Sequence, residues 1–218
     1  MGFKTMKLVN PNADLHTHSM QFSDGLNTID ELVWMAGKLG LKKLAITDHS
    51  DARPMPLIAY RVVLGRYKNV VNDVEVVFGV EADLLNEDGD ICSTIQKIES
   101  KFILLSAHPD TYKGDPKRIT EAWLKAIERH HDKLQFLGHP CDYFPHVDIA
   151  QVTRAANEYN IPLEVNTSNL TTGRTDMKVS DEMVSLAEQI VVNTDAHSLS
   201  DMTSRESGIE YLRNGGYL

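Results

Sequence analysis

Apolar residues along the chain form short runs that alternate with amphipathic segments. A short apolar run between polar residues is typical of a buried strand, whereas apolar positions three and four apart are typical of a helix. Seven strands are predicted. They lie within a stretch ending at 14–18 and within 42–49, 74–83, 102–110, 134–140, 161–168 and 189–197.

Between these strands the pattern predicts helices, within 27–40, 57–67, 89–100, 115–131, 148–159 and 180–189. In the first helix Thr28 and Glu31 have the spacing of a capping box, and Gly40 suits the end of the helix. Asp115 can cap the fourth helix, with Pro116 in its first turn.

Strands such as FILLSA and QIVV are apolar on both faces, as expected when helices cover a parallel sheet. This alternation fits both an open, doubly wound sheet and a closed barrel. No Pro- or Gly-rich linker and no low-complexity tract divides the chain, so residues 1–218 are expected to form one α/β domain.

The end of each predicted strand carries metal-ligand or hydrogen-bonding side chains. They are His16 and His18, Asp48 and His49, Glu81, His108, His139, Asn166, and Asp195 and His197. Because the C-terminal ends of parallel strands face one side, these residues are expected to converge on one rim. Residues two apart on a strand share a face, so His16 with His18, and Asp195 with His197, can each hold one ion or two adjacent ions. Asp24 can return to the rim from the loop.

Six of the nine histidines fall at these predicted strand ends. A donor set of imidazoles and carboxylates without thiolates suits zinc, manganese or iron. The set is too large for one ion, so the sequence predicts a multinuclear metal site.

Composition limits the possible partners and the cellular location. The net charge is −9 and no basic tract is present, which argues against a sequence-independent grip on nucleic acid. Cys92 and Cys141 form no CxxC pair, and no apolar run reaches membrane length, so a cytoplasmic protein with free thiols and no membrane contact is expected.

In order along the chain, the segments DLHTHS, ITDHS, GVEAD, SAHPD, GHPCDY and NTDAHS resemble the successive motifs of the polymerase and histidinol phosphatase (PHP) family of metal-dependent phosphoesterases. The resemblance implies a distorted (β/α)7 TIM-like barrel with a di- or trinuclear centre at the C-terminal rim of the strands. It also implies a stand-alone phosphatase that acts on a small phosphorylated metabolite and can form homo-oligomers.

Carried over position by position, the resemblance implies three ion sites. One ion is held by His16, His18, Glu81 and Asp195, and Glu81 bridges to a second on His108 and His139. The third is held by Asp24, His49 and His197. Stand-alone phosphatases of the family often have a histidine where this chain has Asp24, so the third site can be filled or empty. The resemblance therefore implies two or three ions of zinc, manganese or iron.

Such ions lower the pKa of a bound water and stabilise charge on phosphoryl oxygens, so hydroxide attack on phosphorus is the expected reaction. Asp195, His197 or a water on the metal can protonate the leaving alcohol. Arg174 is the preferred phosphate clamp, with Arg53 and Arg205 as weaker candidates.

Other polar residues near the motifs have less specific expectations. Asp48 can orient a ligand or form a turn. Asn166 and Ser168 can line the pocket or satisfy loop backbone. Cys141 is expected to be a packed side chain, and the two tryptophans, Trp34 and Trp123, are expected in the core.

Hydrolysis of a small phosphate monoester, in the manner of a histidinol phosphatase, is the leading hypothesis. The alternatives are phosphodiester cleavage of a nuclease-like kind, amidohydrolase-type attack on a C–N bond, and a non-catalytic metal-binding PHP module. The excess of acidic residues disfavours the nuclease. An amidohydrolase of this kind would need a lysine at the end of the fourth strand, and this chain has none there. The complete ligand set favours a working site over a degenerate one.

Overall fold

A ring of parallel strands forms the centre of the molecule in the computed structural model, which describes residues 6–53 and 59–218. One sheet has the order β1-β12-β11-β10-β9-β5-β6, and a second has the order β2-β3-β4. The strands of the first sheet are β1 (Lys7–Leu8), β5 (Val80–Leu84), β6 (Ile91–Cys92), β9 (Ile103–Ser106), β10 (Leu134–Leu137), β11 (Leu163–Asn166) and β12 (Gln189–Asn193). Those of the second are β2 (Ala13–Thr17), β3 (Lys43–Ile46) and β4 (Glu75–Phe78).

Two parallel bridges join the sheets. Thr17 at the end of β2 pairs with Ala196 after β12, and His49 after β3 pairs with Glu81 in β5. The ring is therefore closed through β2, β3, β4 and β5, β9, β10, β11 and β12. This arrangement confirms the predicted distorted TIM-like barrel rather than the open sheet.

The strand predicted at 74–83 is one stretch of chain with a bend at Gly79. Before the bend, β4 pairs with β3; after it, β5 pairs with β9. A Cβ at Gly79 would lie 2.8 Å from the carbonyl oxygen of Phe102 and 2.9 Å from Cγ2 of Thr47. Only glycine fits this close approach, so this position lets the chain pass from one sheet to the other.

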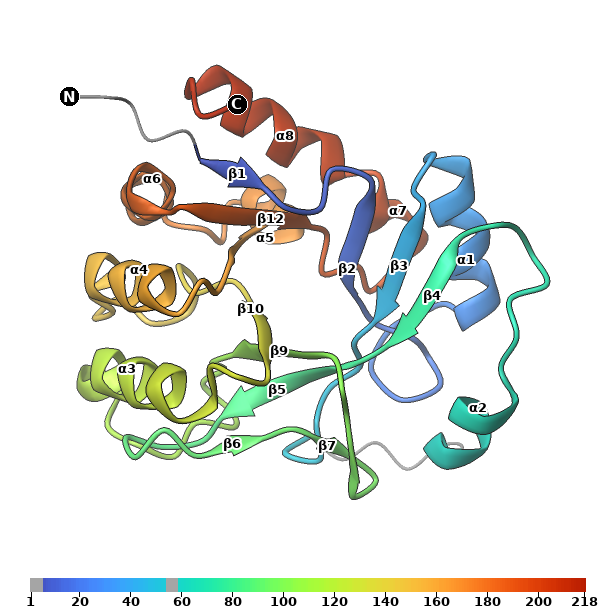
Figure 1. Ribbon diagram of the computed structural model, residues 1–218, viewed down its shortest axis with the longest axis horizontal. Helices are drawn as coiled ribbons and strands as arrows, with labels where there is room; N and C mark the ends of the chain where they lie inside the picture. The colour runs from blue at the N-terminus through green and yellow to red at the C-terminus, as the bar shows by residue number, and fades with distance from the viewer. Residues whose placement is uncertain (1–5, 54–58) are drawn as a thin grey trace.

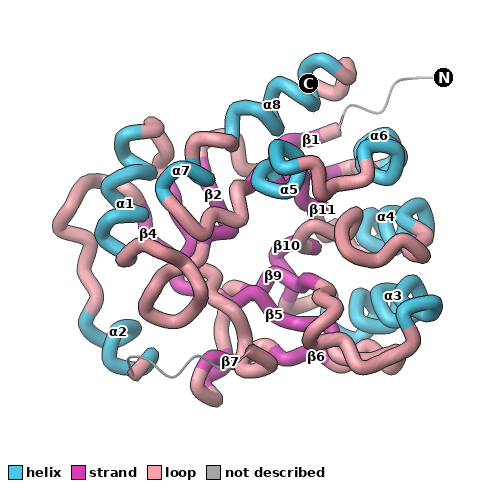
Figure 2. The backbone as a smooth tube through the Cα atoms, turned by 180° about the vertical axis from the view of Figure 1, so that it is seen from behind, coloured by secondary structure: helices cyan, strands magenta, loops and turns pink. Residues whose placement is uncertain are grey.

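Helices surround the ring (Figure 1). The longer ones are α1 (Ile29–Lys38), α3 (Ile119–His130), α4 (Ile149–Glu158), α6 (Met177–Leu186) and α8 (Arg205–Asn214). The shorter ones are α2 (Tyr60–Arg66), α5 (Thr167–Thr172), α7 (Leu199–Met202) and the 3-10 turn η1 (Pro116–Arg118). Figure 2 shows α5 and α7, which follow β11 and β12, in front of the strands when the molecule is seen from behind.

Local signals in the sequence explain several helix boundaries. Thr28 and Glu31 form the predicted capping box of α1, and Asp115 caps the turn η1 that leads into α3. The predicted helix 148–159 corresponds to α4, with Asp148 as its N-cap. The helix predicted at 180–189 begins earlier, because Asp176 caps α6 at Met177.

Three expectations about elements were wrong or incomplete. Residues 89–100 form β6 and a hairpin of β7 (Thr94–Ile95) and β8 (Ile98–Glu99), not a helix. The helices α5, α7 and α8 and the strand β1 were not expected. Of the helix predicted at 57–67, α2 covers 60–66, and residues 57 and 58 lie outside the described residues.

Apolar side chains fill the space between strands and helices. Trp123 on α3 is 2% exposed, as predicted, but the prediction for Trp34 was wrong, because its side chain is 48% exposed on α1 with the Lys38 ammonium over its ring. A smaller cluster of Leu104, Phe136 and Val191 joins β9, β10 and β12. None of the helices in the described part of the chain is both long and apolar enough to cross a membrane.

Candidate metal centre

The C-terminal ends of the barrel strands bring together all nine side chains that the sequence singled out as metal ligands. Their polar atoms face one another over Glu81, which is 1% exposed. They come from β2 and the loop after it (His16, His18, Asp24), from β5 (Glu81), and from the residues that follow β3, β9, β10 and β12 (His49, His108, His139, Asp195, His197).

Glu81 lies at the centre of the group. Its Oε1 is 2.9 Å from Nε2 of His139, 3.3 Å from Nε2 of His108 and 3.5 Å from Nε2 of His16. Its Oε2 is 2.8 Å from Nδ1 of His49 and 3.5 Å from Nε2 of His18. One carboxylate therefore contacts five imidazoles.

A second carboxylate, Asp195, closes the group from the side of β12. Its Oδ1 is 3.3 Å from Nε2 of His16 and 3.0 Å from Nε2 of His18. The residue has a φ of +52°, a left-handed conformation that is uncommon outside glycine. Asn166 donates a hydrogen bond of 3.0 Å to Oδ2, so the carboxylate is held from its outer side.

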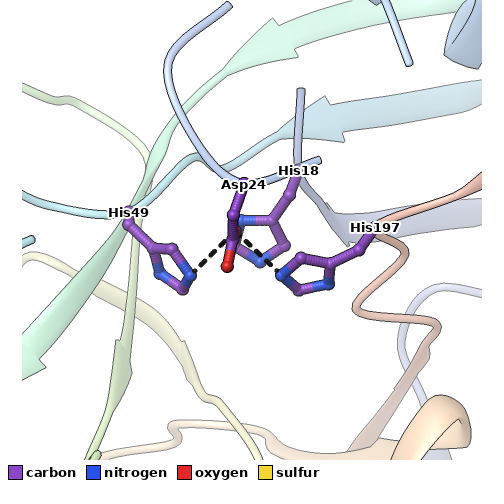
Figure 3. Close-up of side chains that lie close together, drawn as sticks. All are labelled: His18, Asp24, His49 and His197. Carbon is purple, nitrogen blue, oxygen red and sulfur yellow. Dashed lines mark ion pairs between the residues drawn. The ribbon is translucent and has the colours of Figure 1, made fainter. Parts of the chain in front are cut away.

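The outermost part of the group is built around Asp24 (Figure 3). Oδ1 of Asp24 lies 3.3 Å from Nε2 of His49 and 3.1 Å from Nε2 of His197. Together with His18 these residues form one set whose possible ligand atoms lie within 4.8 Å of one another. Asp24 is the most exposed of the four.

Several imidazoles are held by a hydrogen bond to the nitrogen that points away from the centre. Nδ1 of His16 is 3.0 Å from Oε1 of Glu164, and Nδ1 of His108 is 2.8 Å from Oδ1 of Asp83. Such outer partners fix the orientation and tautomer of a metal-binding histidine. They leave Nε2 of both rings directed at Glu81.

Burial and neighbouring charge act differently on the two histidines of β2. Burial opposes protonation of His16, but the charges around it, that of Glu164 first, raise its pKa well above the usual value. For His18, burial together with the charges of His197 and His49 lowers the pKa to about 3. His18 is therefore neutral at pH 7, the form in which imidazole binds a metal ion.

The carboxylates remain ionised. Burial opposes this for Glu81 and Asp195, yet the imidazoles around them, beginning with His108 for Glu81, keep both pKa values well below the usual range. Hydrogen bonds from His197 and then from His49 lower the pKa of Asp24 as well. Three negative charges thus face a set of nitrogen donors.

This arrangement fits metal ions. Among the described residues, buried Nε2 atoms of His16 and His18 and Oε2 of Glu81 make no hydrogen bond. An unpaired buried polar atom is costly, and a cation bound between such atoms removes that cost. Besides the set around Asp24, two further sets with ligand atoms within 4.8 Å are His16, Glu81 and His139, and His16, His18 and Asp195.

A cavity of about 590 Å³ opens over the group. Arg174, in the loop after α5, and Arg53, in the loop after β3, both line it. Arg53 also lies 3.2 Å from Nε2 of His49 and forms an ion pair with Asp110. Arg205 was wrongly considered for this role, because its buried guanidinium donates to backbone carbonyls instead, for example that of Val192.

The remaining polar residues with open expectations differ in position, and Ser168 is the one among them that lines this cavity. Asp48 accepts hydrogen bonds from the backbone and hydroxyl of Ser19, at 2.6 and 2.8 Å. Asn166 caps α5 and also bonds Asp195, and Ser168 lines the cavity and donates to a backbone carbonyl. Cys141 is buried, with its Sγ 3.4 Å from Sδ of Met183.

Sequence reasoning missed the outer carboxylates Asp83 and Glu164 and the cavity residue Tyr143. A signal for the first two existed, since Asp83 lies two residues after Glu81 and therefore shares its face of β5. Glu164 likewise precedes Asn166 by two residues on β11. For Tyr143 no pattern in the sequence indicated that its ring faces the cavity.

Comparison with known proteins agrees with this geometry. The family model of the PHP domain matches residues 14–168, which include seven of the nine converging side chains. The chain belongs to the PHP family. Each of the three sets of converging ligand atoms includes residues within this match, and Asp195 and His197 lie beyond it.

Relatives of this PHP protein are named as phosphatases. A "probable phosphatase" from Thermoanaerobacter sp. (strain X514) is 28% identical over 97% of this chain and 88% of its own length. A "probable phosphatase" from Shewanella baltica (strain OS195) is 32% identical over 74% of this chain and 64% of its own.

Among solved structures, histidinol phosphate phosphatase (HisK) from Lactococcus lactis subsp. lactis Il1403 is similar to the PHP protein with a TM-score of 0.56 and 15% identity. The similarity covers 92% of this chain and 93% of that one. The structure of HisK contains zinc, L-histidinol and phosphate. At this identity the similarity establishes the shared fold.

Proposed function

We propose that this PHP protein is a metal-dependent phosphatase that hydrolyses small phosphate monoesters at a di- or trinuclear centre. The observation that carries the proposal is the convergence of six imidazoles and three carboxylates at the rim of the barrel, with Nε2 of His16 and His18 buried and without a hydrogen bond among the described residues. The names of the curated relatives support the same activity.

The expected ligand sets overlap with the clusters of the structure, although the cluster around Asp24 also includes His18, and His108 lies outside the clusters of the described residues. His16, His18 and Asp195 would hold one ion together with Glu81, which lies within 3.5 Å of both imidazoles. His108 and His139 would hold a second ion with Glu81, and Asp24, His49 and His197 would hold a third. When bound, these ions supply a hydroxide nucleophile near neutral pH and stabilise charge that develops on phosphoryl oxygens.

Residues of the cavity provide for the phosphate itself. The three carboxylates carry less charge than two or three divalent cations, and the six imidazoles add no negative charge. The loaded pocket is therefore positive and attracts an anion, although the protein as a whole is acidic. Arg174 and Arg53 can each present two parallel N–H groups to phosphate oxygens. They follow β11 and β3, which lie on opposite sides of the ring, and therefore hold the phosphate from two directions.

The leaving alcohol needs a proton, and His197 is the proposed donor. Although burial opposes this, the hydrogen bond with Asp24 and the charge of Asp195 raise the pKa of His197, whereas Asp195 stays ionised. Both line the cavity. His197 hydrogen-bonds through Nδ1 to the backbone oxygen of Asp195 at 3.0 Å, which directs Nε2 toward Asp24 and the cavity.

Histidinol phosphate is a candidate substrate because the similar HisK structure holds L-histidinol and phosphate. Other small monoesters fit the same chemistry. A phosphodiesterase needs a track for the second ester group, and the net charge of −9 disfavours a polynucleotide there.

The test is phosphate release by protein reloaded with zinc or manganese. The substrates are p-nitrophenyl phosphate, bis-p-nitrophenyl phosphate and histidinol phosphate, each with and without a chelator. We expect monoester turnover that is lost on chelation and in an Asp195→Ala variant. The matched control is His146→Ala, which removes an exposed histidine outside the centre.

The outcomes separate the alternatives. Turnover of the bis-ester alone would replace the proposal with a nuclease-like activity. Tight zinc binding without turnover of any of the three substrates would favour a non-catalytic metal-binding module. The rate on histidinol phosphate, relative to p-nitrophenyl phosphate, decides whether that metabolite is a substrate.

A further inference from the structure

Tyr143 combines an unusual backbone conformation with a position in the cavity. Its φ is +65°, in the left-handed region, where a bulky side chain is strained. Among the described residues six other than glycine have a positive φ, namely Gln96, Lys97, His139, Tyr143, Asn160 and Asp195. Three of them belong to the site, and Tyr143 is the one of these three that is not a proposed ligand.

The left-handed conformation of Tyr143 separates it from two buried neighbours. On one side of it, Asp142 is buried and accepts a hydrogen bond of 2.7 Å from Asn169. On the other side, Phe144 is buried with its ring edge-on to Tyr112. The left-handed turn lets both neighbours face inward while the ring of Tyr143 stays 42% exposed and lines the cavity.

The ring stands next to the metal centre. Its centroid is 5.5 Å from that of His139 and 5.8 Å from that of His108, the two histidines proposed for the second ion. The ring of Tyr143 therefore lies beside both histidines and faces the same cavity as they do.

The cavity is larger than a phosphate needs. A volume of about 590 Å³ is in the range of pockets that hold small organic ligands, about 300–1,000 Å³. The part of a substrate beyond its phosphorus must fill the remainder. Tyr143 and Pro109 give this part of the pocket apolar surface, while Ser168 and Thr172 line it with hydroxyls.

We propose that Tyr143 is a specificity-determining residue whose ring packs against the leaving group, and that the preferred substrates are phosphate monoesters whose alcohol carries a flat ring. This inference rests on the proposed function. Asparagine and glycine adopt the left-handed region more readily, so a tyrosine kept at φ +65° indicates a use for its ring. Offset or edge-to-face ring contacts supply the recognition.

The experiment compares two alkyl esters, 2-phenylethyl phosphate and ethyl phosphate, with zinc- or manganese-loaded protein. Both leaving groups are primary alcohols, so the ratio of their kcat/KM values reports recognition of the ring. We expect wild type to prefer the phenyl ester, and Tyr143→Asn to reduce this preference about tenfold, through KM. Tyr143→Phe keeps the preference because it keeps the ring.

Two controls test whether the effect is local. The Tm of Tyr143→Asn is expected to stay close to that of wild type, because asparagine relieves the backbone strain. Tyr159→Ala removes another tyrosine, one that stacks on His131 at the end of α4, and should leave the ratio unchanged.

The inference is overturned if wild type shows no preference for the ring, or if Tyr143→Asn keeps the wild-type ratio. It is also overturned if Tyr143→Phe loses the preference to the same extent, since the hydroxyl would then be the recognised group. Failure of the proposed function is distinguishable: no metal-dependent release occurs from p-nitrophenyl phosphate either, and the inference falls with it.

Discussion

Glu164 holds metal-centre residues in place although it is not itself a proposed ligand. Its carboxylate accepts from Nδ1 of His16 at 3.0 Å, from the backbone N–H of His139 at 3.0 Å and from Nδ2 of Asn193 at 2.8 Å. The side chain is fully buried. The substitution Glu164→Gln keeps its shape but removes its charge and half of its acceptor capacity.

The magnitude follows from the three donors. A glutamine offers one acceptor oxygen, so at least one buried donor faces its NH₂ group. A buried donor without a partner costs about 1–3 kcal/mol, and hydrogen bonds to a charged group are stronger than neutral ones. We expect the free energy of unfolding of the metal-free protein to fall by about 2–4 kcal/mol.

The metal affinity should fall as well. The carboxylate orients the ring of His16 and increases the basicity of its Nε2, and loss of such a partner typically costs about 10–100-fold in affinity. Competition with a chromogenic zinc chelator measures this directly, and urea unfolding with a chelator measures stability.

Asp148→Ala is the control. Asp148 caps α4 through its bond to the backbone of Gln151, remote from the centre, so its loss should cost about 1 kcal/mol and leave zinc affinity unchanged. The reasoning on Glu164 is refuted if Glu164→Gln binds zinc within about twofold of wild type, or if Asp148→Ala weakens zinc binding as much.

Three further outcomes are expected. Zinc at about 100 times its Kd should stabilise the wild type by about 2.7 kcal/mol, seen as a higher Tm, and Asp195→Ala should show a smaller shift. Trp123→Ala should cost about 3–5 kcal/mol in urea unfolding, whereas Trp34→Ala on the exposed face of α1 should cost less than about 1 kcal/mol. Burial lowers the pKa of His130, so the folded state favours its neutral form. The free energy of unfolding of wild type relative to His130→Gln should therefore decrease as the pH falls from 7 to 5. A constant difference would contradict this.

The parts of the fold that could be predicted had strong and repeated signals. Apolar runs such as FILLSA are buried on both faces in β9, and each run ends at a chemically distinctive residue. The barrel itself could not be separated from an open sheet by pattern alone, because closure depends on pairing between residues far apart in the chain, such as Thr17 with Ala196.

The wrong helix at 89–100 has a physical explanation. Ile91, Ile95 and Ile98 follow a spacing of four and three, which matches one face of a helix. The structure forms a hairpin instead, in which Gln96 and Lys97 make the turn with positive φ. Asp51 stabilises this turn by accepting from their backbone N–H groups, a long-range contact that no local pattern reveals.

The prediction for Trp34 was wrong because it did not separate the buried face of the helix from the outer face. The buried positions of α1 are Ile29, Leu32, Val33 and Ala36, and one step along a helix turns the side chain by about 100°. Trp34 follows Val33 and so points away from that stripe. The spacing of the buried residues therefore indicates that Trp34 lies on the outer face of α1, where its large apolar ring stays exposed.

The metal centre and the cavity depend on different parts of the barrel. Most of the proposed ligands lie on a strand or within three residues after one, namely His16, His18, His49, Glu81, His108, His139 and Asp195. The sheet therefore fixes most of the metal centre. The residues proposed to meet the substrate, Arg53, Tyr143 and Arg174, stand farther along, six to eight residues after the last residues of β3, β10 and β11. Because loops vary with less cost to the fold than strands do, a change of substrate in this family should arise in these loops while the metal-binding strand ends stay unchanged.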